Sequence, residues 1–166
     1  MPASIIDGKA VAEEIRTSIA AEAEEMTRSG RPPKLVAVQV GEDPASKLYT
    51  DMQARQCESA GLVYELMNLP EDISQDGLAA AIGKLNSDVS VSGLILQMPL
   101  PDHLDASEAQ LAIAPEKDVE GIHPVNLGRL FSGTAFVYPC TPLAAVELLT
   151  RTCDDLNGKE AVIVGR

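Results

Sequence analysis

Short apolar runs that alternate with segments of helical periodicity most constrain what this chain can fold into. The run "KLVAVQVG" (residues 34–41) is rich in β-branched residues and ends at a glycine, which is typical of a buried strand. Before it, across residues 9–28, apolar side chains recur at close to helical spacing. Gly30 and the two following prolines end that segment. The pattern predicts an opening amphipathic helix that leads into a buried strand.

The same alternation continues after Gly41. Ser46 is the predicted N-cap of a helix that runs to about Ala60, and "LVYELMNL" (residues 62–69) is the next predicted strand. Ser74 is the predicted cap of another helix, which extends through about Leu85.

A third strand is predicted in "VSGLILQMPLP" (residues 91–101), which two prolines close, and a helix in "DASEAQLAIA" (residues 105–114). Strands separated by helices of this length indicate an α/β fold with a mainly parallel sheet and helices on both faces. In such sheets ligands bind beyond the carboxyl ends of the strands. The segments after Val40 and around Gln97 are therefore the first places to look for a site.

The remainder of the chain is expected to be less regular. The stretch "KDVEGIHPVNLGRLFSG" (residues 117–133) reads as loop, and Thr141-Pro142 should open a helix to about Thr150, with Thr as cap. "NGKEAVIVGR" (residues 157–166) reads as a turn and a new strand. We therefore expect one α/β domain over residues 1–150, followed over residues 151–166 by a linker and the first strand of a second domain.

The composition excludes several classes of partner. A formal net charge of −12 and a pI near 4.5 argue against binding to nucleic acid, which requires clustered Lys and Arg. The sequence contains neither a basic amphipathic stretch nor an apolar run of membrane-spanning length, and its N-terminus does not resemble a secretory signal. Three scattered cysteines lack metal-ligand spacing. We expect a reduced, cytoplasmic protein that binds no membrane and no metal.

Two polar positions stand out on the predicted elements. Tyr49 and Gln53 lie four residues apart and share a helix face, where a ring could stack on a planar heterocycle and an amide could donate and accept hydrogen bonds. A half-buried helix face is the alternative. Gln97 ends an apolar strand, where a buried amide needs a partner, either a neighbouring loop or a ligand.

The stretch "PEKDVEGIHPVN" (residues 115–126) gathers charged side chains in a predicted loop. Lys117 fits a solvated charge that stabilises a turn. Glu120, beside Gly121, could accept a hydrogen bond from a ligand's ring N–H or amino group. His123 has no second His or Cys at metal-ligand spacing.

Five motifs, taken together, resemble the methylenetetrahydrofolate dehydrogenase/methenyltetrahydrofolate cyclohydrolase family, in the family's order and at its approximate spacing. They are "VGEDPASKLYTDMQARQCESAG", "GLILQMPLP", "PEKDVEGIHPVNLGRL", "PCTP" and "GKEAVIVGR". The resemblance implies a folate-binding α/β domain beside a Rossmann domain that binds NADP or NAD, usually in a homodimer. It also implies oxidation of 5,10-methylenetetrahydrofolate to the methenyl form, which many members then hydrolyse.

The resemblance also implies roles for particular residues. Tyr49 matches the tyrosine that stacks near the folate rings, and Gln97 and Pro99 belong to a motif that binds substrate. Glu120 stands where the family has an aspartate that holds the pterin. Gly165 and Arg166 match the beginning of the turn that binds the cofactor phosphate.

Gln53 departs from the family pattern, which has a lysine four residues after the tyrosine. That lysine assists the proton transfers of hydrolysis, and glutamine cannot exchange a proton near neutral pH. With Tyr49, Gln53 and Gln97 as the catalytic group, the sequence predicts a dehydrogenase with weak or absent cyclohydrolase activity. The alternative is a folate-binding or interaction domain without catalysis.

Overall fold

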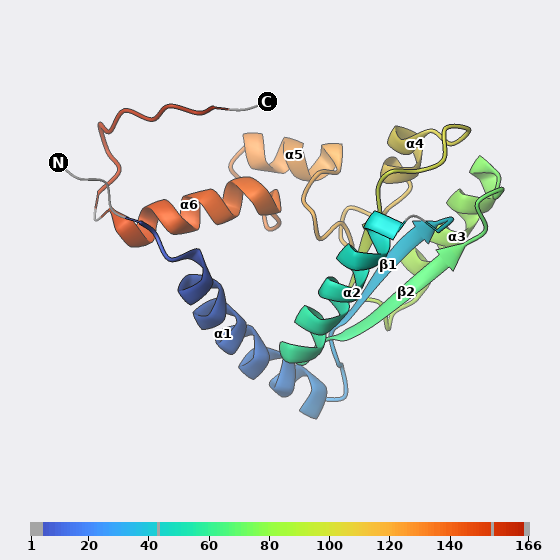
Figure 1. The fold of residues 1–166 in the computed structure, drawn as a ribbon, viewed down its shortest axis with the longest axis horizontal. Helices are drawn as coiled ribbons and strands as arrows, with labels where there is room; N and C mark the ends of the chain where they lie inside the picture. Colours follow the sequence, from blue (N-terminus) through green and yellow to red (C-terminus); the bar gives the residue numbers. More distant parts are fainter. Residues whose placement is uncertain (1–4, 43, 154, 165–166) are drawn as a thin grey trace.

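The fold is built on a parallel sheet at one end of the molecule, with helices beside the strands (Figure 1). The structure is a computed structural model that describes residues 5–42, 44–153 and 155–164. Its strands are β1 (Lys34–Val40), β2 (Val63–Leu69) and β3 (Gly93–Leu96), in the order β2-β1-β3. β1 pairs with β2 along its whole length and with β3 over four residues. All three strands match runs predicted from the sequence.

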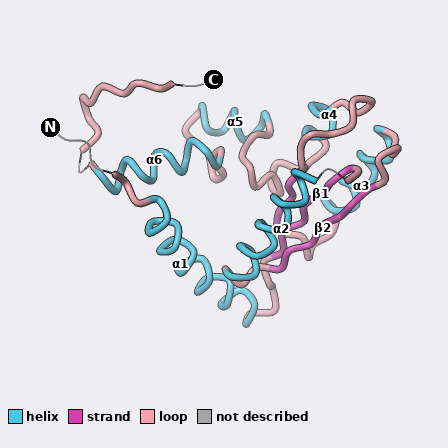
Figure 2. Tube along the Cα trace, in the orientation of Figure 1, coloured by secondary structure: helices cyan, strands magenta, loops and turns pink. Residues whose placement is uncertain are grey.

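Six helices complete the described chain. They are α1 (Gly8–Arg28), α2 (Pro44–Ser59), α3 (Gln75–Ser87), α4 (Ala106–Leu111), α5 (Pro124–Phe131) and α6 (Cys140–Thr152). Figure 2 shows α2 and α3 beside the strands, with α1 and α6 extending away from them. Ser74 caps α3 as predicted, because its hydroxyl oxygen accepts a hydrogen bond from the backbone N–H of Gly77 at 3.2 Å.

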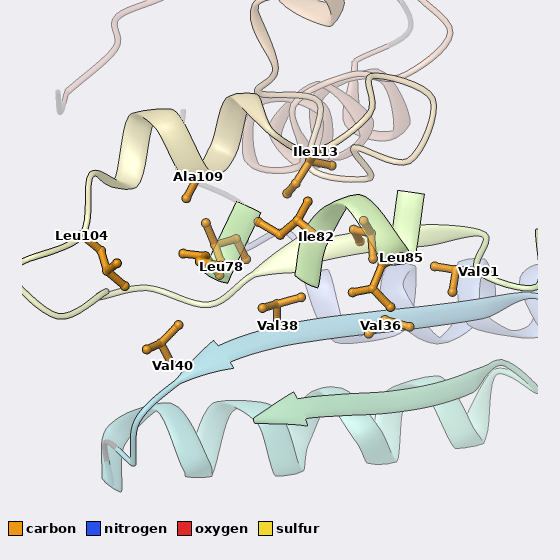
Figure 3. Packing of buried hydrophobic residues seen from close by; sticks show 12 residues of the cluster. Val36, Val38, Val40, Leu78, Ile82, Leu85, Val91, Leu104, Ala109 and Ile113 are labelled. Atoms are coloured by element: carbon orange, nitrogen blue, oxygen red, sulfur yellow. The ribbon is translucent and has the colours of Figure 1, made fainter. Parts of the chain in front are cut away.

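The hydrophobic core lies between β1 and α3 (Figure 3). Side chains alternate along a strand, so Val36, Val38 and Val40 face the same side and pack in a cluster with Leu78 and Ile82 of α3. α2 covers the opposite side, as Figure 3 shows below the strands. The expected α/β architecture, with helices on both faces of a parallel sheet, is therefore confirmed.

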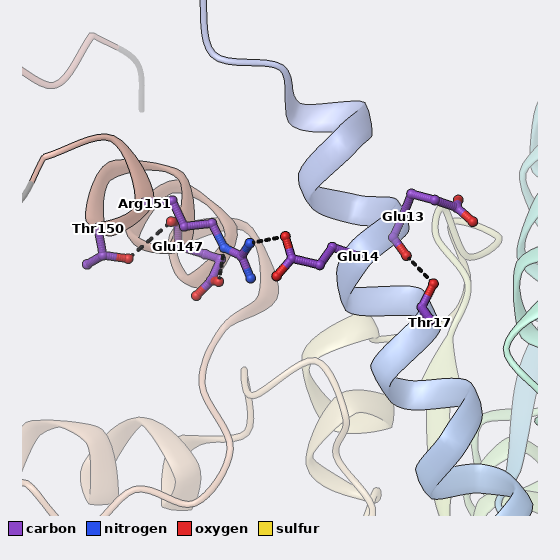
Figure 4. Close-up of polar contacts among 6 residues, drawn as sticks. All are labelled: Glu13, Glu14, Thr17, Glu147, Thr150 and Arg151. Carbon is purple, nitrogen blue, oxygen red and sulfur yellow. Dashed lines mark hydrogen bonds and ion pairs between the residues drawn. The ribbon is translucent and has the colours of Figure 1, made fainter.

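α1 and α6 meet at a distance from the sheet (Figure 1). In Figure 4, Arg151 of α6 lies between two carboxylates, donating to Glu14 of α1 at 2.7 Å and to Glu147 at 2.6 Å. The far end of α1 packs near α2, where Ala23 is buried and its Cβ lies 3.5 Å from the position that a Cβ on Gly61 would occupy. α1 thus links α6 to the sheet region.

The structure differs from the predicted boundaries at two helix starts. α2 begins at Pro44, so Ser46 lies inside the first turn and is not the cap. Proline is favoured at the start of a helix because its ring fixes a helical φ and it has no N–H to leave unpaired. α6 begins at Cys140, with Pro139 in the N-cap position and no side-chain cap, and it ends at Thr152. Thr141 is therefore a helical residue.

Two further predictions were wrong. Residues 124–131, predicted as loop, form α5. Residues 161–164, predicted as a strand, pair with none of the described strands, and Val162, Ile163 and Val164 are each at least 88% exposed. A strand requires a hydrogen-bonded neighbour, and the described residues supply none there. Among the described helices, none combines the length and apolar character needed to cross a bilayer.

Candidate active site

A pocket of about 430 Å³ opens where β3 ends. Its walls come from α2, the end of β3, α4 and the segment that follows Asp118. The lining residues are Tyr49, Gln53, Ile95, Leu96, Gln97, Met98, Pro99, Gln110, Glu120 and Ile122. The fold thus brings all five predicted substrate-site residues that lie within the described chain, namely Tyr49, Gln53, Gln97, Pro99 and Glu120, into one pocket.

The helix α2 positions Tyr49 and Gln53 one turn apart. The Tyr49 side chain is about half exposed at 52%, so its ring is free to meet a ligand. The lining also includes the apolar side chains of Ile95, Met98 and Pro99. The Met98–Pro99 peptide bond is cis. The pocket therefore combines an available aromatic ring with an apolar surface, which suits a planar heterocycle.

Gln53 and Gln97 form the polar centre of the pocket. The amide nitrogen of Gln97 donates to Oε1 of Gln53 at 2.8 Å. Gln97 is 6% exposed, and its backbone N–H donates to the carbonyl oxygen of Val38 at 2.8 Å, so it is held at the sheet edge. The partner of its buried amide is a side chain of α2 and not a neighbouring loop.

Tyr64 is a member of this group that the sequence analysis missed. Its hydroxyl donates to Oε1 of Gln53 at 3.2 Å. Burial is the main cause that raises the pKa of Tyr64 to about 12, so the hydroxyl remains a donor at neutral pH. Met67 and Leu69 of β2 pack toward the α3 core, so strand alternation places Tyr64 on the α2 side, a signal that the sequence did contain.

Glu120 reaches the pocket because the preceding residues are tied to β3. The backbone N–H of Leu94 donates to the carbonyl oxygen of Lys117 at 2.8 Å, and Leu94 forms an isolated parallel bridge with Asp118. Burial raises the pKa of Glu120, and the nearby Asp118 carboxylate raises it further. Gly121, with φ of +68°, follows directly, and a Cβ there would meet the Tyr138 backbone at 2.6 Å.

The buried carboxylate of Asp118 holds this segment in place by hydrogen bonds. Asp118 is 1% exposed, and its Oδ2 accepts hydrogen bonds from the His123 backbone N–H at 2.8 Å and from the Asn126 amide at 2.9 Å. His123 is the N-cap of α5, where its Nδ1 accepts from the Val125 N–H at 3.1 Å. His123 thus has a structural role, and among the described residues no cluster of His, Cys, Asp and Glu could hold a metal ion.

Lys117 was predicted to be a solvated charge, but its ammonium group is hydrogen-bonded. Its Nζ donates to the carbonyl oxygens of Leu85 at 2.7 Å and Asp88 at 2.6 Å, which lie at the end of α3. A lysine near the C-terminus of a helix satisfies carbonyl groups that have no intrahelical partner. Lys117 is therefore a link between α3 and the segment that carries Glu120.

Gln110 of α4 also lines the pocket and was missed. Its amide nitrogen is buried and has no hydrogen-bond partner among the described residues. The predicted cofactor residues, Gly165 and Arg166, lie outside the described residues. A larger hollow of about 930 Å³ shares Pro99 with the pocket but is lined mainly by residues 100–103 with Glu71 and Asp72, none of which was predicted to act.

Comparison with known proteins identifies the family of the chain. Residues 6–120 match the family model described as "Tetrahydrofolate dehydrogenase/cyclohydrolase, catalytic domain". The chain belongs to the tetrahydrofolate dehydrogenase/cyclohydrolase family. The family resemblance inferred from the sequence motifs is thereby confirmed.

The curated relatives of this family include the bifunctional protein FolD of Geotalea uraniireducens. That protein is 44% identical over 164 residues, which are 99% of this chain and 59% of the relative. The chain thus spans about three fifths of the length of the curated relatives that it matches.

Solved structures of the family share the fold. FolD methylenetetrahydrofolate dehydrogenase/cyclohydrolase from Campylobacter jejuni superposes with a TM-score of 0.94 at 38% identity, covering 98% of this chain and 58% of that one. The Trypanosoma brucei enzyme, complexed with NADP and an inhibitor, has a TM-score of 0.83 at 32% identity, covering 92% and 53%. The NAD-dependent dehydrogenase of Saccharomyces cerevisiae has a TM-score of 0.73 at 32% identity, covering 87% and 48%.

Proposed function

We propose that the protein binds a reduced folate in this pocket and acts in one-carbon metabolism, oxidising 5,10-methylenetetrahydrofolate to 5,10-methenyltetrahydrofolate with NADP or NAD. The observation that carries the proposal is the convergence of Tyr49, Gln53, Gln97 and Glu120 on one cavity. Membership of the family supports the same substrate class.

The chemistry of the walls suits a pterin. The exposed ring of Tyr49 offers a stacking surface, and the apolar side chains in the lining offer further contact to a flat ring system. Glu120 supplies an acceptor for the N–H and amino groups of a pterin, while the amides of Gln53 and Gln97 supply neutral polar groups. These residues bind and orient the folate, and hydride transfer depends strongly on such orientation.

The nicotinamide cofactor supplies the hydride acceptor when it is bound. Its proposed identity, NADP with NAD as the second possibility, rests on the Trypanosoma brucei and Saccharomyces cerevisiae relatives. The described residues contain no G-x-G-x-x-G turn for a dinucleotide phosphate. A cytoplasmic homodimer, without nucleic-acid or membrane partners, remains the proposed setting.

Cyclohydrolase activity is proposed to be weak or absent. Gln53 stands at the position of the family lysine, and its amide neither gains nor loses a proton near neutral pH. The wall also contains the carboxyl of Glu120, which belongs to a different segment of the chain from Gln53. A second candidate function, folate binding without catalysis, is favoured by this same substitution.

Two measurements on the purified protein separate these functions. Isothermal titration with 5-formyltetrahydrofolate, a stable reduced folate, should show binding that Tyr49→Ala weakens. Formation of NADPH or NADH from 5,10-methylenetetrahydrofolate should then report the dehydrogenase. Binding without nucleotide reduction would select the second candidate, and the absence of any reduced-folate binding would contradict both.

A further inference from the structure

The oxygen of the Gln53 amide accepts hydrogen bonds from two residues that lie on either side of β1. Tyr64 belongs to β2 and Gln97 follows β3, and these strands flank β1 in the order β2-β1-β3. Both side chains donate to Oε1 of Gln53, at 3.2 Å and 2.8 Å. A residue of α2 is thus fixed by hydrogen bonds from both edge strands.

Two donors on one oxygen determine how the amide is turned. A half-turn of the Gln53 amide would place its NH₂ group against the NH₂ group of Gln97, and two donors repel one another. In the observed arrangement, Nε2 of Gln53 has no hydrogen-bond partner in the described chain and is not among the buried, unpaired polar atoms. Since Gln53 lines the pocket, this N–H donor is available to a ligand.

We propose that Tyr64 is a positioning residue for the folate site. By donating to Oε1 of Gln53, its hydroxyl turns the Gln53 amide so that Nε2 donates to an acceptor atom of the bound folate. The nature of the ligand rests on the proposed function, whereas the orientation of Gln53 does not. Tyr64 itself is absent from the pocket lining, so it acts through Gln53.

A double-mutant cycle tests this coupling with 5-formyltetrahydrofolate as the probe. Tyr64→Phe removes one hydroxyl, and we expect it to weaken binding about fivefold, the effect of a single hydrogen bond. In a Gln53→Ala background the same change should leave the affinity unaltered. Tyr138→Phe, which removes the hydroxyl of an exposed tyrosine outside the pocket, is the matched control. Equal weakening in both backgrounds, or no weakening in either, would overturn the proposal.

A second measurement needs no ligand. The side-chain amide signals of Gln53 in a ¹H–¹⁵N spectrum, assigned by their loss in Gln53→Ala, should shift in Tyr64→Phe and stay in place in Tyr138→Phe. Unmoved signals in Tyr64→Phe would overturn the positioning role whatever the folate affinity. A shift in a protein that binds no 5-formyltetrahydrofolate would support the orientation of Gln53 and contradict the proposed function alone.

Discussion

The amide nitrogen of Gln97 lies 2.8 Å from Oε1 of Gln53, and this hydrogen bond joins residues 44 positions apart in sequence. It connects the end of β3 to the middle of α2, directly in the wall of the pocket. The polar centre of the site therefore exists only when the helix and the sheet edge are assembled.

Replacing Gln97 by alanine should weaken the binding of 5-formyltetrahydrofolate about tenfold. The change removes a donor from Oε1 of Gln53 and a buried amide from the wall, and losses of this kind amount to about 1–3 kcal/mol. Isothermal titration measures the effect. Gln56→Ala, on an exposed position of α2, should bind like the unchanged protein, and comparable affinities for the two variants would contradict the assignment.

Replacing Gln53 by lysine should increase the hydrolysis of 5,10-methenyltetrahydrofolate. A lysine supplies a group that can transfer protons, and general acid–base catalysis contributes about 10²-fold or more. The Tyr64 hydroxyl, now adjacent to glutamine, can accept a hydrogen bond from the new ammonium group. Decay of the methenyl absorbance gives the rate. Gln56→Lys adds the same charge outside the pocket, and an equal rate in both variants would refute this explanation.

Glu120 should make the folded state less stable as the pH rises. Burial raises its pKa above the ordinary value of 4.5, so folding favours the protonated carboxyl. The stabilisation is complete below pH 4.5 and is lost as the pH rises through the raised pKa of the folded state. The melting temperature of Glu120→Gln minus that of the unchanged protein should therefore be larger at pH 7 than below pH 4.5.

Thermal unfolding at several pH values checks this prediction. Glu58→Gln removes one charge from an exposed position of α2 and controls for the overall net charge. The same Glu120 variant should bind 5-formyltetrahydrofolate more weakly at pH 7, since a neutral amide replaces the carboxylate. A melting-temperature difference that does not vary with pH would show that ionisation of Glu120 is not its cause.

Removing the Asn126 side chain should destabilise the fold by about 1.5–3 kcal/mol, the range for hydrogen bonds to a charged group. Asn126 is 1% exposed, and its amide donates to the Asp118 carboxylate and to the Pro115 carbonyl oxygen. Urea unfolding of Asn126→Ala measures the loss. The exposed Asn157→Ala should unfold like the unchanged protein. Equal midpoints would mean that the Asp118 carboxylate finds other partners.

The sequence predicted the elements whose pattern is local. The three strands and α1, α3 and α4 follow from periodicity and from capping residues such as Ser74. α5 was missed because its eight residues include Pro124 and Gly128, and its position depends on contacts of His123 and Asn126 with Asp118. Residues 161–164 show the converse, since β-branched composition alone does not form a strand without a neighbour.

The sequence predicted part of the site, as it predicted part of the fold. The spacing of Tyr49 and Gln53 indicated a shared helix face, and the place of Gln97 at a strand end indicated the correct edge of the sheet. Tyr64 was not found: strand alternation places it on the α2 side, but its hydrogen bond to Gln53 depends on how α2 packs against β2, which no local pattern specifies.

The parallel register of the sheet has a consequence for how the chain folds. Lys34 pairs with Val63 and Leu35 pairs with Gly93, so every strand pairing closes a long loop that contains at least one helix. Closing such loops costs chain entropy before any ladder hydrogen bond forms, and non-local pairings of this kind slow folding. We therefore expect the helices to gain structure before the strands align, and the pocket, which joins α2 to the end of β3, to form in the last stage.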